Sequence, residues 1–108
     1  MKPSQNKIRK ILQEFKKEAE KIFGDKFAGL ILFGSFARGE ASSDSDLDLL
    51  LLVRKRLTKK EDEKLSELSV SLSLKYDLLI TCFPYPEKAY QSWETPFLMN
   101  VRKDGVWI

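Results

Sequence analysis

The sequence predicts an α/β or α+β fold in which a small mixed sheet is flanked by helices. Two short apolar segments, residues 27–33 and 46–53, have the length and composition of buried strands. A segment with helical spacing of apolar residues precedes them, and a second helical segment follows them. A third strand-like run comes next, and the order helix, strand, strand, helix, strand indicates a sheet packed against helices.

The first helix is expected over residues 6–23, where apolar side chains recur at three- and four-residue steps. Ser4 is its expected N-cap and Gly24 its expected end. The apolar run 27–33 follows directly and is closed by Gly34. We therefore expect a helix that leads through a short turn into the first buried strand.

The second strand is expected at residues 46–53. Residues 35–41 are short enough for a brief helix, and residues 42–45 read as a polar loop. Because side chains alternate along a strand, Asp46 and Asp48 project from the same face. Apolar residues occupy both faces of the rest of this strand, so we expect both of its faces to be covered.

The second long helix is expected to begin at Thr58, because Glu61 three residues later completes a capping-box pattern. It is expected to run to about Leu74, with Leu65, Leu68 and Leu72 as its buried edge. A third strand is expected at residues 76–83. Pro84 and Pro86 are expected to stop that strand.

The last part of the chain, residues 87–108, is expected to form two short helices. Thr95 caps the second of these, Pro96 takes its first position and Gly105 ends it. Residues 106–108 are expected to add an edge strand.

The composition excludes several kinds of chemistry. Cys82 is the single cysteine and there is no histidine, so an internal disulfide, a Cys/His zinc site and histidine catalysis are excluded. Cys82 lies on a strand that is expected to be buried, where side chains alternate between the two faces, and it is expected to be a core residue. The formal net charge of +3 is mild, and no basic cluster is interleaved with aromatic residues. Nucleic acid is therefore not an expected partner.

The length of 108 residues suits one domain, which we expect to span residues 1–108. No apolar run approaches the ~20 residues of a membrane-spanning helix. The N-terminus lacks the apolar stretch and cleavage site of a signal peptide. We therefore expect a cytoplasmic protein that does not enter a membrane.

Two short motifs carry the candidate chemistry, and ten residues separate them: Gly34-Ser35 and Asp46-Leu47-Asp48. Gly34 allows a sharp turn after the strand, and Ser35 can open a helix whose free N–H groups accept phosphate oxygens. The paired carboxylates of Asp46 and Asp48 offer hard oxygen ligands to Mg²⁺, as in two-metal phosphoryl-transfer sites. Each motif alone has an ordinary structural explanation, whereas their combination predicts a metal-dependent site for a nucleoside triphosphate.

Two further residues are candidates for the same site. Asp77 opens an otherwise apolar expected strand, where an unpaired acid is costly. If that strand neighbours the second, Asp77 can approach Asp48 as a third metal ligand or as the general base. Arg38 can neutralise triphosphate charge, although a solvated surface role is equally open.

These residues resemble the polymerase-β-like nucleotidyltransferase superfamily, and the stretch from Gly34 to Leu49 is similar to its minimal, stand-alone branch. The resemblance implies the nucleotidyltransferase fold. It also implies that Gly34 and Ser35 bind the NTP phosphates, that Asp46 and Asp48 bind Mg²⁺, and that Asp77 is the third carboxylate.

The resemblance also implies a partner. Minimal members of this branch often pair with a small helical HEPN-domain protein and act as antitoxins that transfer AMP from ATP to a tyrosine of that toxin. Larger relatives use additional domains to hold base and acceptor, and this chain has no room for one. We therefore expect its acceptor to come from another chain.

Three other functions stay open at this point, and one of them is the untemplated addition of nucleotides to RNA. The chain can neutralise a partner toxin by binding alone, without catalysis. It can also transfer a nucleotide to a small molecule such as an aminoglycoside, although the absence of a second domain disfavours this. A templated polymerase is disfavoured because the chain lacks a basic duplex-binding surface.

Overall fold

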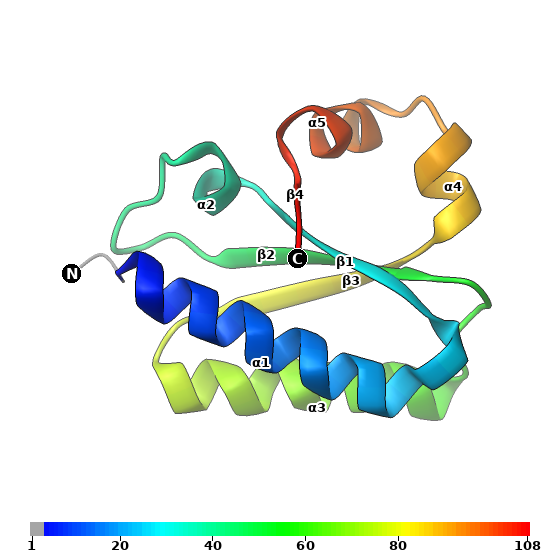
Figure 1. Cartoon of the computed structure of the whole chain (residues 1–108), viewed down its shortest axis with the longest axis horizontal. Coiled ribbons are helices and arrows are strands. Elements are labelled where there is room, and N and C mark those ends of the chain that lie inside the picture. The colour runs from blue at the N-terminus through cyan, green and yellow to red at the C-terminus, as the bar shows by residue number, and fades with distance from the viewer. Residues whose placement is uncertain (1–3) are drawn as a thin grey trace.

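The computed structural model describes residues 4–108 of the chain, which form one four-stranded sheet between two layers of helices (Figure 1). The elements, in chain order, are α1 (Gln5–Phe23), η1 (Gly24–Lys26), β1 (Phe27–Phe33), α2 (Ser35–Arg38), β2 (Leu47–Val53), α3 (Lys59–Tyr76), β3 (Ile80–Pro86), α4 (Glu87–Ser92), α5 (Pro96–Asp104) and β4 (Val106–Trp107). The strand order is β3-β2-β1-β4, with β2 and β3 parallel and the other pairs antiparallel. The expected mixed sheet flanked by helices is thus confirmed.

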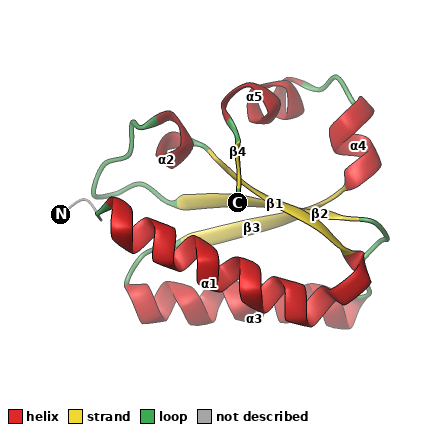
Figure 2. Ribbon diagram, in the orientation of Figure 1, coloured by secondary structure: helices red, strands yellow, loops and turns green. Residues whose placement is uncertain are grey.

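The first helix forms as its sequence signals predict. The Ser4 side chain accepts a hydrogen bond from the backbone N–H of Lys7, and Gly24 ends the helix. The buried stripe contains Ile11 and Phe15, both fully shielded from solvent. With α3, this stripe covers one face of the sheet and forms the larger hydrophobic core (Figure 2).

The other face of the sheet is covered by the C-terminal helices. Leu50 and Leu52 of β2 pack there against Tyr90 of α4 and against Leu98 and Val101 of α5. The strand β4 lies at the outer edge beside β1, as expected from the last residues. No helix in the described part of the chain combines the length and apolar character needed to cross a membrane.

The helix α3 begins at the expected capping box. Thr58 accepts from the backbone N–H of Glu61, and the Glu61 carboxylate accepts from the backbone N–H of Thr58. Lys26 of the 3₁₀ turn also donates to the Glu61 carboxylate. These donors lower the pKa of Glu61 from 4.5 to about 2, and the hydrogen bond from Lys26 has the largest effect.

We expect Glu61→Gln to lower the thermal unfolding midpoint at neutral pH. A group whose pKa is lowered on folding stabilises the folded state above its unfolded pKa, and this contribution is lost as the pH falls from about 4.5 to about 2. Glutamine preserves the capping pattern, so the difference between the two proteins isolates the charge. Thermal melts from pH 7 to pH 2 test this, and a difference that stays constant across that range would contradict it.

The third strand differs from the sequence prediction at both ends. Helix α3 runs to Tyr76 because Lys75 and Tyr76 both donate to Glu14 of α1 and hold its last turn. β3 then begins at Ile80 and includes both Pro84 and Pro86 instead of stopping before them. It is an edge strand, where a proline is tolerated because its missing N–H can face solvent.

Candidate active site

The candidate site lies where β1 ends and β2 begins, on the face of the sheet that carries α5. Asp48 is paired with Phe33, the last residue of β1, so both share this face. Leu50 and Leu52 continue the same face of β2 toward the smaller core. Asp48 is half-buried, at the point where that core gives way to solvent.

Gly34 brings the two sequence motifs into contact. It forms the N-cap of α2 with φ 79° and ψ −157°, a conformation that side chains strongly disfavour. A β-carbon added at Gly34 would lie 2.5 Å from Oδ2 of Asp48. The turn is therefore closed directly over the Asp48 carboxylate, and only a glycine leaves room for it.

Asp46 lies at the end of the polar loop that precedes β2. The backbone N–H of Ser42 donates to the Ser45 hydroxyl at 2.8 Å, and the N–H of Ser45 donates to the Ser42 carbonyl at 3.2 Å. This turn ends immediately before Asp46, whose side chain is exposed. The next residue, Leu47, is already paired with the third-strand segment through a hydrogen bond to the Leu79 carbonyl at 2.9 Å.

Thr81 is a site residue that the sequence reasoning missed. It is the β3 partner of Asp48, and its hydroxyl donates to Oδ1 of Asp48 at 2.8 Å. One carboxylate oxygen thus accepts from Thr81 while the other lies against Gly34. The polar hydroxyl in an otherwise apolar strand was a signal, but the parallel register was needed to connect it to Asp48.

We expect Thr81→Val to lower about tenfold the rate of the nucleotide transfer that the sequence predicts for this site. Valine keeps the branched shape, and a hydrogen bond to a charged group contributes about 1.5 kcal/mol or more, which equals a tenfold change in rate. Thr81→Ser should stay within about threefold of the wild type, because it keeps the hydroxyl. Steady-state kinetics of the three proteins test this, and equal activity of the valine variant would contradict it.

Asp77 does not lie where the sequence predicted. It is the C-cap of α3, with φ 50° and ψ 49°, and its side chain is exposed. Three residues separate it from Thr81, the strand residue beside Asp48, so the expected place of Asp77 on the third strand is wrong. Among residues 4–108, no group of three or more acidic, cysteine or histidine side chains is arranged to hold a metal ion. Asp48 lies on β2 at this site, and Asp46 lies two residues earlier, in the loop just before the strand begins at Leu47.

Ser35 and Arg38 lie on α2 beside this pair. The Ser35 side chain is half-buried, and its hydroxyl has no hydrogen-bond partner among the described residues. Nε of Arg38 lies 3.3 Å from Oε2 of Glu40 in an exposed ion pair. Such surface pairs contribute little, so Arg38 can exchange Glu40 for another anion at small cost.

Cys82 is on the opposite face of the sheet from Asp48. It packs against the larger core, and this burial raises the pKa of its thiol. The expected core role of Cys82 fits this position, since a thiol with a raised pKa is a poor nucleophile.

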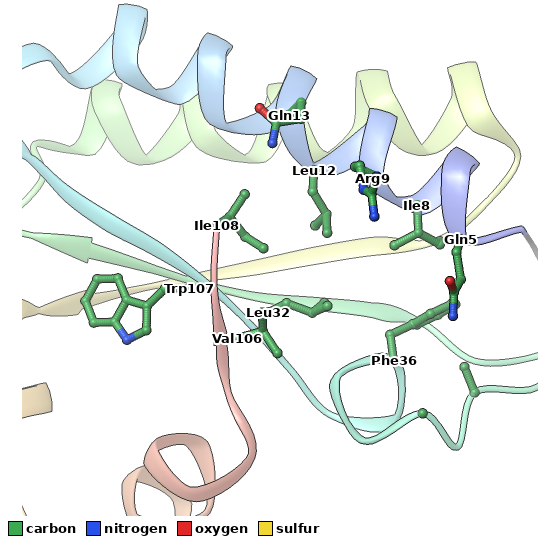
Figure 3. Close-up of a pocket in the computed structure, with 12 residues that line it drawn as sticks. Gln5, Ile8, Arg9, Leu12, Gln13, Leu32, Phe36, Val106, Trp107 and Ile108 are labelled. Atoms are coloured by element: carbon green, nitrogen blue, oxygen red, sulfur yellow. The ribbon is translucent and has the colours of Figure 1, made fainter.

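Two hollows flank the α2 segment on opposite faces of the sheet. A pocket of 210 Å³ lies on the Asp48 face and is bordered by Gly34, Arg38 and α5. A groove of 500 Å³ lies on the other face, with Ile8 and Leu12 of α1 opposite Leu32 and Phe36 (Figure 3). The groove is larger, but the smaller pocket shares Gly34 with the candidate carboxylate site.

Comparison with known proteins decides the family. The family model of the nucleotidyltransferase domain matches residues 6–107. The chain is a member of this nucleotidyltransferase family. A protein of Methanocaldococcus jannaschii, provisionally named a protein adenylyltransferase, is 40% identical over 99 residues, which are 92% of this chain and 96% of that protein.

Solved structures share the fold of this nucleotidyltransferase. A chain of a toxin–antitoxin complex with AMP-PNP superposes with a TM-score of 0.60 at 23% identity, over 97% of this chain and 72% of that one. A chain from the complex of a tri-AMPylated HEPN toxin with an MNT antitoxin, from Shewanella oneidensis, gives a TM-score of 0.52 at 20% identity. That match covers 88% of this chain and 69% of the other.

Proposed function

We propose that this nucleotidyltransferase transfers AMP from ATP to a tyrosine hydroxyl of a HEPN-type toxin and thereby acts as the antitoxin in the cytoplasm. The observation that carries the chemistry is the contact between the Gly34 turn and the Asp48 carboxylate. It places the glycine-serine motif, a candidate phosphate site, directly beside a carboxylate of the candidate metal site.

The donor set suits Mg²⁺. Asp46 and Asp48 supply only carboxylate oxygens, and hard oxygen ligands are those that Mg²⁺ prefers. The exposed position of Asp46 leaves room for water and phosphate oxygens, which commonly complete the coordination of this ion. When bound, Mg²⁺ would neutralise charge on the triphosphate and on the departing pyrophosphate.

The side chains of this chain divide the remaining work. Thr81 holds one Asp48 oxygen and so fixes the orientation of the carboxylate. The hydroxyl of Ser35 and the guanidinium of Arg38 would bind phosphate oxygens beside the turn. The acceptor hydroxyl oxygen forms a bond to the α-phosphorus and gives its proton to solvent water. The bond between the α-phosphorus and the oxygen that bridges it to the β-phosphate breaks, and pyrophosphate leaves with that oxygen. Asp77 is given no role in this reaction, because it ends α3 and lies before β3, the strand that borders Asp48.

The acceptor is proposed to lie on another chain. The relative at 40% identity bears the provisional name of a protein adenylyltransferase, and one structural neighbour comes from a complex with a tri-AMPylated HEPN toxin. Both names support a protein acceptor. Asp46 and Arg38, the last residue of α2, are both exposed, which leaves the site open to a second protein.

Label transfer tests the proposal. The protein, with the partner that copurifies, is incubated with Mg²⁺ and ATP labelled at either the α- or the γ-phosphate. Label on a partner tyrosine from α-labelled ATP alone is the expected result, because the transferred group is AMP. Label from the γ-position would show phosphoryl transfer. A stable complex without label from any NTP would favour neutralisation by binding alone, and label on added aminoglycosides without a partner would favour a small-molecule acceptor.

A further inference from the structure

The pocket beside Gly34 continues the candidate active site onto α5. Its walls are Phe33, Gly34 and Arg38 on one side and four residues of α5 on the other, and its volume is 210 Å³. Because Gly34 also lies against the Asp48 carboxylate, the pocket adjoins the candidate metal ligands Asp46 and Asp48. A nucleotide whose phosphates lie at the Gly34 turn therefore has this pocket within reach.

The α5 wall combines an aromatic ring with polar groups on one helical face. Phe97, Asn100 and Asp104 are three and four residues apart and line the same pocket. Phe97 is held edge-on to Phe33, with ring centroids 5.4 Å apart, and remains 38% exposed. A rigid, partly exposed ring beside two hydrogen-bonding side chains suits a nucleoside, which has a flat apolar face and polar edges.

Within residues 4–108, no hydrogen-bond or ion-pair partner explains the position of Asp104. It is the last residue of α5, where the helix dipole disfavours a negative charge. Its neighbour Arg102 is engaged elsewhere, with Glu94 and the Tyr90 carbonyl. Neither Asp104 nor Asn100 has a side-chain hydrogen bond or ion pair with any of residues 4–108. Both side chains line the pocket with their hydrogen-bonding capacity free.

We propose that this pocket holds the nucleoside of the substrate nucleotide, with the Asp104 carboxylate accepting hydrogen bonds from the ribose hydroxyls and Phe97 packing against the base. Carboxylates are well suited to this, since a ribose offers two adjacent O–H donors and a deoxyribose fewer. Asn100 presents an amide, the group that pairs with the donor and acceptor on the edge of adenine. This inference rests on the proposed function and adds to it the basis of ribonucleotide selection.

Calorimetric binding tests the pocket without any turnover. The ligands are an ATP analogue with a methylene bridge between the α- and β-phosphates, its 2′-deoxy counterpart and tripolyphosphate, each with Mg²⁺. Asp104→Asn should weaken binding of the ribonucleotide about tenfold and change the deoxynucleotide and tripolyphosphate less than about twofold. Glu67→Gln, which removes a charge from an exposed site on α3, is the matched control. It should leave the binding affinities of all three ligands unchanged.

The outcomes separate this proposal from the proposed function. If the wild type binds the analogue and transfers AMP, but Asp104→Asn binds the ribonucleotide as tightly, the pocket proposal is overturned and the function stands. It is also overturned if the variant weakens all three ligands equally, or alters only the KM of the acceptor. If the wild type binds none of the ligands, both proposals fall. The thermal midpoint of Asp104→Asn should be equal to or above that of the wild type, because it removes an unfavourable helix-end charge.

Discussion

Asp48→Asn is expected to lower nucleotide transfer by about a thousandfold or more, equivalent to about 4 kcal/mol of transition-state stabilisation, while the fold stays intact. The amide removes the negative charge that a Mg²⁺ ion and the triphosphate need at this position. It preserves size, and its oxygen can still accept the hydrogen bond from Thr81. The loss should therefore be chemical, with little change in stability.

The measurement is label transfer from α-labelled ATP, with circular dichroism and thermal melts to verify the fold. Asp44→Asn is the matched control, because Asp44 is an exposed carboxylate in the loop immediately before Asp46 and should tolerate the change. Transfer by Asp48→Asn at more than about a tenth of the wild-type rate would show that this carboxylate does not hold the metal.

Gly34→Ala should be the second most damaging substitution, reducing transfer about a hundredfold and also destabilising the fold. Two costs combine at this position. The backbone has φ 79° and ψ −157°, a region that costs a non-glycine residue about 1–3 kcal/mol. The added methyl group would lie 2.5 Å from the Asp48 carboxylate, so either the turn or the carboxylate must move.

Gly39→Ala provides the control for backbone strain. Gly39 also has a positive φ, 73°, but a β-carbon there has nothing within 4 Å. It should lower the free energy of unfolding by about 1–2 kcal/mol through its backbone alone, with transfer largely retained. Chemical denaturation and label transfer of both variants separate strain from contact. Equal activity in the two proteins would mean that the Gly34–Asp48 contact has no part in the reaction.

Local signals in the sequence were sufficient for most of the elements. Ser4, the Thr58–Glu61 capping box and Thr95 each begin the helix that their side chains predict. Such caps act within one turn of backbone, so neighbouring residues are enough to specify them. The two apolar strands were equally clear, because their composition and length are local properties.

The third strand shows where local signals fail. Tyr76 was read as the start of a strand, but its hydroxyl reaches Glu14, sixty-two residues earlier, and keeps it in the helix. Pro84 was read as a stop, but the edge position of β3 admits it. Both errors concern contacts between distant segments, and one of them misplaced Asp77.

The sequence by itself therefore determined the fold class and the two motifs whose residues are close together along the chain: Gly34-Ser35 and Asp46-x-Asp48. Only the tertiary structure decided which groups join them. The parallel register brings Thr81 to Asp48 and leaves Asp77 outside the strand, and the packing of α5 places Asp104 beside the Gly34 turn. The physical reason is that register and helix packing depend on burial summed over the whole sheet, which no short segment encodes.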